Sequence, residues 1–161
     1  MSSGETIEIT LTDPQAAILN SNADRNLLMM GQGGGKTNTM GNLSYLLSQN
    51  VPDVMGLIAA NTYRQLTNST LKEIFKQWAS LGFTKYTEAN PSGSYVIDRT
   101  PPKTFTPHKY IFRDNDSKIY CKNGAVIVVA SLDNYMALEG MELGWALLDE
   151  TEATKEEAVA E

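Results

Sequence analysis

The sequence has few of the residues that build disulfides and zinc sites. It contains one cysteine, Cys121, and one histidine, His108, among its 161 residues. A single cysteine cannot form a disulfide within the chain, and its surroundings, KIYCKNG, predict a strand position and a structural thiol. The histidine lies in the loop-like segment FTPHKY and has no cysteine or second histidine to complete a zinc site. The composition therefore argues against a disulfide scaffold and a zinc protein.

Long apolar runs and an export leader are also missing. No stretch approaches the roughly 18 apolar residues that a membrane span needs, and the first ten residues, MSSGETIEIT, lack a basic-then-apolar signal. We therefore expect neither a membrane partner nor secretion. The composition is 42% apolar and 20% charged, as in ordinary globular proteins. At 161 residues the chain has one domain's length and can bury a real core.

Positive charge is scarce and unevenly placed. The formal net charge of −6 argues against a nucleic-acid grip over the whole surface. Residues 85–122 contain seven Lys or Arg against four acids, a balance of +3, whereas residues 133–161 contain nine acids against one lysine, a balance of −8. A polyanion should therefore contact the middle of the chain, where Lys103, Lys109 and Arg113 are the candidates. Solvated surface charge explains the same pattern.

Glycine is concentrated in one segment, LLMMGQGGGKTNTM. Four of the twelve glycines occur there, followed by a lysine and a threonine. The preceding run NLLMM (26–30) has the length of a buried parallel strand. The following residues predict a helix with one apolar face. The glycines are Gly31, Gly33, Gly34 and Gly35, and the apolar face is Met40, Leu43, Leu46 and Leu47. Strand, glycine turn and helix form the setting of a phosphate-binding loop.

In such a loop the backbone N–H groups of Gly33–Gly35 would surround a β-phosphate. Lys36 would reach the β- and γ-phosphate oxygens, and the Thr37 hydroxyl would join the shell of Mg²⁺. The motif G-x-x-x-x-G-K-[ST] asks for glycine where this chain has Met30, so the strict pattern fails at its first residue. A flexible glycine-rich linker is the alternative, and the apolar run and helix on either side argue against it.

A second apolar run ends in two carboxylates. The segment GWALLDETEA (144–153) predicts a strand that presents Asp149 and Glu150 at its carboxyl end, where open α/β sheets bind ligands. Asp149 would hold Mg²⁺, and Glu150 would orient and deprotonate the attacking water. An apolar strand before a solvated acidic turn is the plain alternative. Its place downstream of the glycine segment favours a Walker B strand.

Other segments predict the rest of a sheet with helices. LTDPQAAILNS (11–21) predicts a short helix with Asp13 as its cap and Pro14 at its first position, and the Gln15 amide could pair with an adenine edge. VMGLIAAN (54–61) predicts a buried strand. Leu71, Ile74, Phe75 and Trp78 have helical spacing, with Trp78 in the core.

The remaining third of the chain predicts a β-hairpin and a polar stretch that lies outside the sheet. KIYCKNGAVIVVAS predicts a β-hairpin with a type I′ turn at Asn123-Gly124. Residues 84–117 are polar and contain prolines, with short β-like pieces in SYVID and YIFRD. We expect this stretch to leave the sheet.

With these pieces in order, the chain resembles the N-terminal ATPase part of the large terminase subunit, the DNA-packaging motor of tailed bacteriophages. The resemblance runs through LTDPQAAILNS, GQGGGKT, AANTYRQLTNSTLKEIF and KNGAVIVVASLDNYMALEGMELGWALLDETEA. It covers nearly all of the chain outside residues 84–117. Deviant phosphate loops are common in that family, and the order and spacing of the stretches support the match.

The resemblance implies an open, mainly parallel P-loop NTPase sheet of the ASCE type, flanked by helices. It implies that Gln15 contacts adenine, that Gly31–Thr37 with Gln32 and Lys36 is the Walker A loop, and that Asp149 binds magnesium. Glu150 would be the catalytic glutamate. Residues 1–161 would be the N-terminal portion of an incomplete ATPase domain, without the coupling motif that normally follows and without a nuclease domain.

The resemblance also implies a function. ATP and Mg²⁺ would be the cofactors of a motor that moves double-stranded DNA into a procapsid, in the cytoplasm of a bacterial host and transiently at the portal vertex. The portal protein, the small terminase subunit and further copies in a ring would be partners. Gln32 replaces the arginine frequent in the family's phosphate loop, so we expect slow or no turnover alone. A nucleotide-binding module without turnover and a helicase- or repair-type ATPase are the alternatives.

Overall fold

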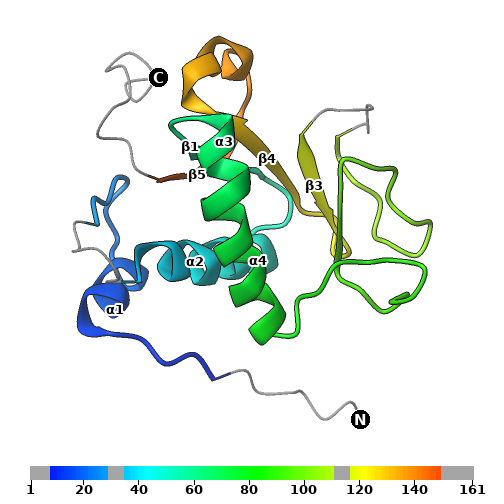
Figure 1. The fold of residues 1–161 in the computed structure, drawn as a ribbon, viewed down its shortest axis with the longest axis horizontal. Helices are drawn as coiled ribbons and strands as arrows, with labels where there is room; N and C mark the ends of the chain where they lie inside the picture. The colour runs from blue at the N-terminus through cyan, green and yellow to red at the C-terminus, as the bar shows by residue number, and fades with distance from the viewer. Residues whose placement is uncertain (1–7, 29–34, 111–116, 150–161) are drawn as a thin grey trace.

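The computed structural model describes residues 8–28, 35–110 and 117–149, which form a five-stranded sheet with helices packed on it (Figure 1). The sheet order is β2-β3-β4-β1-β5. The strands are β1 (Met55–Ala60), β2 (Tyr95–Ile97), β3 (Lys118–Cys121), β4 (Val126–Ser131) and β5 (Leu143–Asp149). The helices are α1 (Asp13–Leu19), α2 (Lys36–Asn50), α3 (Tyr63–Gln65), the π-helix η1 (Leu66–Thr70), α4 (Leu71–Ser80) and the 3₁₀ helix η2 (Leu132–Leu138). The expected α/β class is confirmed.

The sheet is mixed and not mainly parallel. β1 is parallel to β4 on one side and to β5 on the other, while β3 is antiparallel to both β4 and β2. All six residues of β1 are buried, as the apolar segment 54–61 predicts for a central strand. Because β1, β4 and β5 run in the same direction, their carboxyl ends lie along one edge of the sheet.

Different elements cover the two faces of the sheet. Ile58 and Ala60 of β1 pack in a cluster with residues of α2 and α4, whereas Leu57 and Ala59 pack with Phe105 and with parts of η2. This alternation follows the two-residue period of a strand. Figure 1 shows α2 and α4 crossing each other on one face. No described helix is long and apolar enough to cross a membrane.

Helix α2 buries a different face from the one its leucines predict. The small residues Gly41, Ser44 and Ser48 are buried, while Leu43, Leu46 and Leu47 are only partly buried. The cause is α4, which lies close to α2: the Trp78 indole N–H lies 3.1 Å from the Gly41 carbonyl oxygen and 3.0 Å from Ser44 Oγ. Small side chains permit this approach, and leucines in the same positions would prevent it. The position of Trp78 in the core is confirmed.

The segment before the glycines is not a strand where the structure describes it. Residues 26–28 have no regular structure, and the Leu27 side chain is 79% exposed; Met29 and Met30 lie outside the described residues. A parallel strand needs a hydrogen-bonded neighbour, and the sheet order of the described strands ends at β5. The predicted strand over 26–30 is therefore wrong for its first three residues.

Two local predictions are corrected by hydrogen bonds and dihedral angles. The cap of α1 is Thr12 rather than Asp13, because the Thr12 N–H and the Gln15 side chain form a capping box. The β3–β4 hairpin is confirmed, but its turn is not type I′. Among the described residues of this turn only Gly124 has a positive φ, 99°, and Asn123 does not. The Gly124 N–H donates to the Cys121 carbonyl, which favours a type I turn followed by a left-handed glycine.

Residues 84–117 do not all leave the sheet. SYVID supplies β2, whose pairing with β3 makes it an edge strand. The rest of the described stretch is mainly loop and packs over one face through residues such as Phe105. The β-like piece YIFRD lies, apart from Tyr110, outside the described residues.

Candidate functional site

The candidate site begins at the first turn of α2. Gly35 adopts a left-handed backbone with φ of 81°, which glycine tolerates, and the helix starts at the next residue, Lys36. The Gly35 carbonyl accepts hydrogen bonds from the Thr39 N–H at 2.9 Å and from Thr39 Oγ1 at 3.0 Å. Lys36 and Thr37 are half-buried in this turn, where helix N–H groups favour an anion. The predicted Gly31, Gln32, Gly33 and Gly34 lie outside the described residues.

Gln15 links α1 to this turn. Its side-chain Oε1 accepts from the Thr12 N–H at 2.9 Å, and its Nε2 donates to the Gly35 carbonyl at 3.3 Å. The residue is 5% exposed. A side-chain amide has two N–H donors and two acceptor lone pairs, so each atom keeps one hydrogen-bonding position after these contacts. Gln15, the predicted adenine-contacting residue, thus forms a hydrogen bond with Gly35, the last glycine of the predicted phosphate loop.

Asp149 lies at the carboxyl end of β5, as the sequence predicts. It pairs with Ala60, the last residue of β1, and is 8% exposed. Its Oδ2 accepts a 2.7 Å hydrogen bond from Thr70 Oγ1, and Thr70 is fully buried. A buried carboxylate needs such partners, because transfer out of water without them costs several kcal/mol. The neighbouring Glu150 lies outside the described residues.

The start of α2 is directed toward the carboxyl ends of β1, β4 and β5, because Asn123, which precedes β4, donates at 2.8 Å to the Ser48 carbonyl near the end of α2. Helix α2 contacts β5 directly, and Met40, one turn after Lys36, belongs to the same core cluster as Leu147 of β5 and Ala60 of β1. The predicted anion-binding turn and the predicted metal carboxylate therefore belong to two elements that contact each other.

The side chains of the candidate site are of the kind that bind magnesium with few protein ligands. Among residues 8–28, 35–110 and 117–149 no three or more His, Cys, Asp or Glu side chains cluster as a metal site would require. Magnesium in nucleotide sites uses one or two carboxylates, and waters and phosphate oxygens fill the other positions. A buried aspartate, Asp149, and a half-buried threonine, Thr37, are side chains of the kind that such a site uses.

Sequence reasoning missed Thr70 entirely. In TNSTLKEIF this threonine precedes an apolar helical segment, and such a position is typical of a helix cap. Its partner is 79 residues away in the sequence. No local pattern indicates a contact over that separation.

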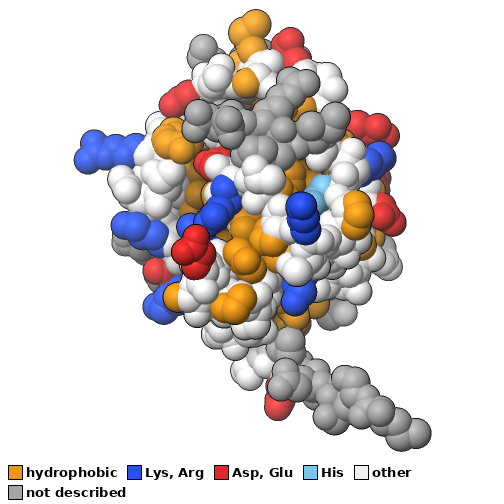
Figure 2. All heavy atoms as spheres, turned by 90° about the vertical axis from the view of Figure 1, so that its right-hand side faces the viewer, with side chains coloured by type: hydrophobic (Ala, Val, Ile, Leu, Met, Phe, Trp, Pro, Cys, Tyr) orange, Lys and Arg blue, Asp and Glu red, His pale blue; other side chains and the backbone are white. Residues whose placement is uncertain are grey.

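A second polar and aromatic surface lies far from this edge. Segment 101–110 forms a cavity of about 350 Å³ beside β3. It is lined by Pro101, Pro102, Lys103, Phe105, Thr106, Pro107, His108, Tyr110 and Tyr120. Figure 2 shows apolar side chains on this face, with lysines and arginines scattered among them and the single histidine in pale blue. Burial lowers the pKa of His108, against a smaller upward effect of its hydrogen bond with the Cys121 carbonyl at 2.8 Å.

The His108 and Cys121 side chains have structural contacts. The His108 ring packs edge-to-face on Tyr120, and the Cys121 thiol is fully buried with its pKa raised to about 12 by that burial. Cys121 is therefore a structural thiol in a strand, as predicted.

Compared with models of known families, with curated proteins and with solved structures, this chain gives no significant match.

Proposed function

We propose that this chain binds ATP with Mg²⁺ and hydrolyses it as part of a viral DNA-packaging motor. The observation that supports this most directly is the contact between two elements that each carry a predicted site feature. These are the helix that begins at Lys36 after a glycine-rich segment, and the strand that ends in the buried Asp149. The resemblance to terminase large subunits supplies the motor and DNA parts of the proposal.

Each residue at the edge has a role in this proposal. The Lys36 ammonium pairs with phosphate oxygens, and the helix N–H groups add favourable partial charge. Thr37 and Asp149 are the side chains that would hold the metal, which when bound supplies positive charge that offsets the charge of the phosphates. Glu150 follows Asp149 directly and is our candidate to orient the attacking water.

The binding part is tested by calorimetry with ATP and Mg²⁺. Lys36→Ala should weaken ATP binding by at least about tenfold, or ~1.4 kcal/mol, because it removes the cation that meets the phosphates. Lys72→Ala is the matched control, since Lys72 is exposed on α4. Equal affinity of the Lys36→Ala variant and the wild type would reject the phosphate site.

The turnover part is tested by phosphate release. Glu150→Gln should leave ATP affinity within about twofold and abolish turnover, because the glutamate acts on the water and not on ground-state binding. A binding module without turnover is the second candidate. It is favoured by Gln32, whose amide can hydrogen-bond a phosphate but cannot offset its charge. Tight ATP binding by the wild type with no phosphate release, even with DNA and a longer terminase partner present, would select that candidate.

A further inference from the structure

The helix that follows β1 contains a π-turn over Leu66–Thr70, between α3 and α4. Its last bond runs from the Leu71 N–H to the Leu66 carbonyl, one residue farther than in an α-helix. π-Turns are rare, and they are found disproportionately at functional sites. This one ends at Thr70, whose side chain reaches Asp149.

The Thr70 hydroxyl behaves differently from other helical threonines in this chain. Thr39 Oγ1 and Thr67 Oγ1 donate to carbonyls four residues back, those of Gly35 and Tyr63, both at 3.0 Å. That local bond is the usual one for a threonine inside a helix. Thr70 instead donates to the carboxylate of a distant strand, at the short distance of 2.7 Å. Both partners are buried, so solvent does not compete for the bond.

We propose that Thr70 is a positioning residue for Asp149, and this rests on the proposed function. The β1–β5 ladder fixes the Asp149 backbone through its pairing with Ala60. Thr70 then holds Oδ2 and so restricts rotation of the carboxylate, which leaves the other oxygen for magnesium and its waters. Some residues orient a metal ligand without touching the metal. Mutation of such a residue typically lowers metal affinity by roughly 10–100-fold.

The same helical segment also connects Asp149 to α2, the helix that begins at Lys36. Thr70 directly precedes α4, and Trp78 of α4 donates to the Gly41 carbonyl of α2. Gln77 of α4 adds a 2.8 Å hydrogen bond from its Nε2 to Asn42 Oδ1. Helix α4 is therefore bonded to the metal carboxylate at one end and to the helix of Lys36 at the other.

The test compares Thr70→Ala with Thr70→Ser, two variants that both lack the threonine methyl and differ by one hydroxyl. ATP affinity is measured by calorimetry with and without Mg²⁺, alongside the thermal unfolding of the ligand-free protein. We expect both variants to bind metal-free ATP as the wild type does. Thr70→Ala should lose about tenfold of the affinity gained with Mg²⁺, and Thr70→Ser should retain it. Thr67→Val is the control, because its hydroxyl donates within its own helix.

The outcomes separate this inference from the function on which it rests. If the wild type shows no Mg²⁺-dependent ATP affinity, the proposed function fails and this role fails with it. If the wild type shows that dependence and folded Thr70→Ala keeps it in full, the function survives and the positioning role is wrong. A lower unfolding temperature of Thr70→Ala with unchanged Mg²⁺ dependence would also overturn the role, because it would assign Thr70 to stability alone. If Thr70→Ala does not fold, Thr70→Val, which keeps the branched shape of threonine and lacks its hydroxyl, takes its place with the same criteria.

Discussion

Buried polar side chains in this protein are held by partners from distant parts of the chain. The Gln15 amide joins α1 to Gly35, and Thr70 joins η1 to Asp149. A buried hydrogen bond contributes on the order of 1 kcal/mol net, whereas a partner left unsatisfied costs about 1–3 kcal/mol. Removing one member therefore costs more than the bond itself contributes. Such residues fix the geometry of the candidate site.

His108 should make the protein less stable in mildly acidic solution. Burial lowers its pKa in the folded state below the ordinary value of 6.5, so the unfolded chain binds the proton more readily. Stability is then fully present above pH 6.5 and is lost as the pH falls through the lowered folded pKa. His108→Gln keeps a side-chain donor for the Cys121 carbonyl but does not titrate. Urea unfolding at pH 7 and pH 5 should show a smaller loss in this variant than in the wild type, and equal losses would contradict the burial argument.

Local sequence patterns select candidate residues more easily than they select the partners of those residues. Lys36, Thr37 and Asp149 are candidates because lysine after glycines and a carboxylate after an apolar run are local patterns. Thr70 was not, because its role depends on a bond to a strand far along the sequence. The roles assigned to Gln15, Lys36, Thr37 and Asp149 stay predictions, as do those of the residues outside the described part of the chain, which are Gly31, Gln32, Gly33, Gly34 and Glu150.

At the scale of elements, α2 packs closely against α4 at Gly41. Alanine at Gly41 would place its Cβ 2.8 Å from Gln77 Cβ, which is too close for two carbon atoms. Alanine inside a helix is normally about 1 kcal/mol more favourable than glycine, but overpacking costs about 1–3 kcal/mol. The second effect should win, because both atoms are attached directly to helix backbones and cannot turn away.

We therefore expect Gly41→Ala to lower the free energy of unfolding by about 1 kcal/mol, measured by urea denaturation. The control is the same change in a Gln77→Gly background, which removes the crowded atom. There the alanine should be neutral or stabilising relative to Gln77→Gly alone. A higher stability of Gly41→Ala in the otherwise wild-type chain would show that the helices can separate freely.

Elements were predictable where their own residues determine them. The buried run of β1, the helical spacing of α4 and the Asn123-Gly124 hairpin are all present in the structure. The predictions failed where a neighbour decides. Residues 26–28 have no described strand beside them, and the buried face of α2 follows from Trp78 rather than from its own leucines. The turn type failed because Asn123 adopts an ordinary negative φ.

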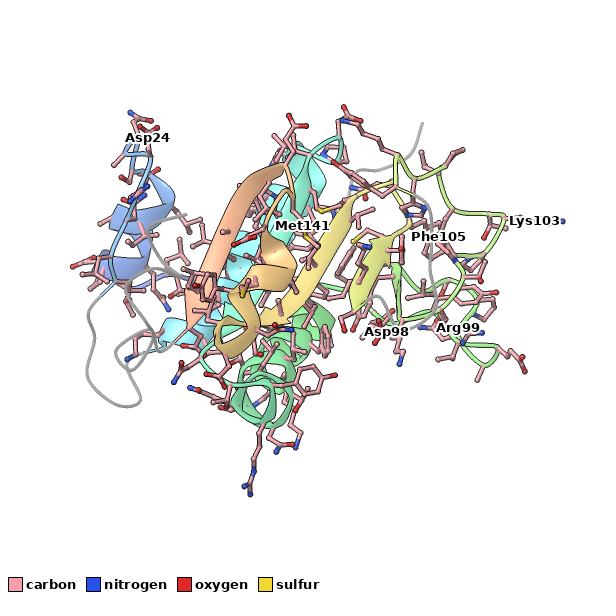
Figure 3. All side chains as sticks on the ribbon, turned by 90° about the horizontal axis from the view of Figure 1, so that it is seen from above. Asp24, Asp98, Arg99, Lys103, Phe105 and Met141 are labelled. Carbon is pink, nitrogen blue, oxygen red and sulfur yellow. The ribbon has the colours of Figure 1, made fainter. Side chains whose placement is uncertain are left out.

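At the scale of the whole molecule, net charge and local charge make opposite predictions for DNA. The protein is acidic, yet Lys103 and Lys109 are exposed on the segment that covers the sheet face away from α2. Lys103 projects outward in Figure 3. If the chain belongs to a DNA-moving motor, as we propose, it must pass every base and should contact phosphates, so its DNA binding should be weak and independent of sequence. Arg113, the third candidate, lies outside the described residues.

The Lys103→Ala, Lys109→Ala double variant should bind double-stranded DNA more weakly than the wild type. It should also show a shallower salt dependence, because each phosphate contact contributes about 0.9 to the slope of log affinity against log salt. The Lys72→Ala, Lys76→Ala variant removes the same charge from the exposed face of α4 and should leave the slope unchanged. Equal slopes for the two double variants, or a preference for one DNA sequence, would contradict this assignment.

The pairing of β1 with β5 determines when during synthesis the candidate site can exist. Lys36 and the whole of β1 are made early, but Asp149 follows only after β2, β3 and β4. Contacts between segments so far apart form late, because a long loop must close first. A nascent chain therefore has the helix of Lys36, our proposed phosphate site, long before it has Asp149, our proposed metal ligand. Under the proposed function, nucleotide with magnesium would stabilise the chain only once β5 has paired with β1, so ligand binding would report that this part of the sheet has folded.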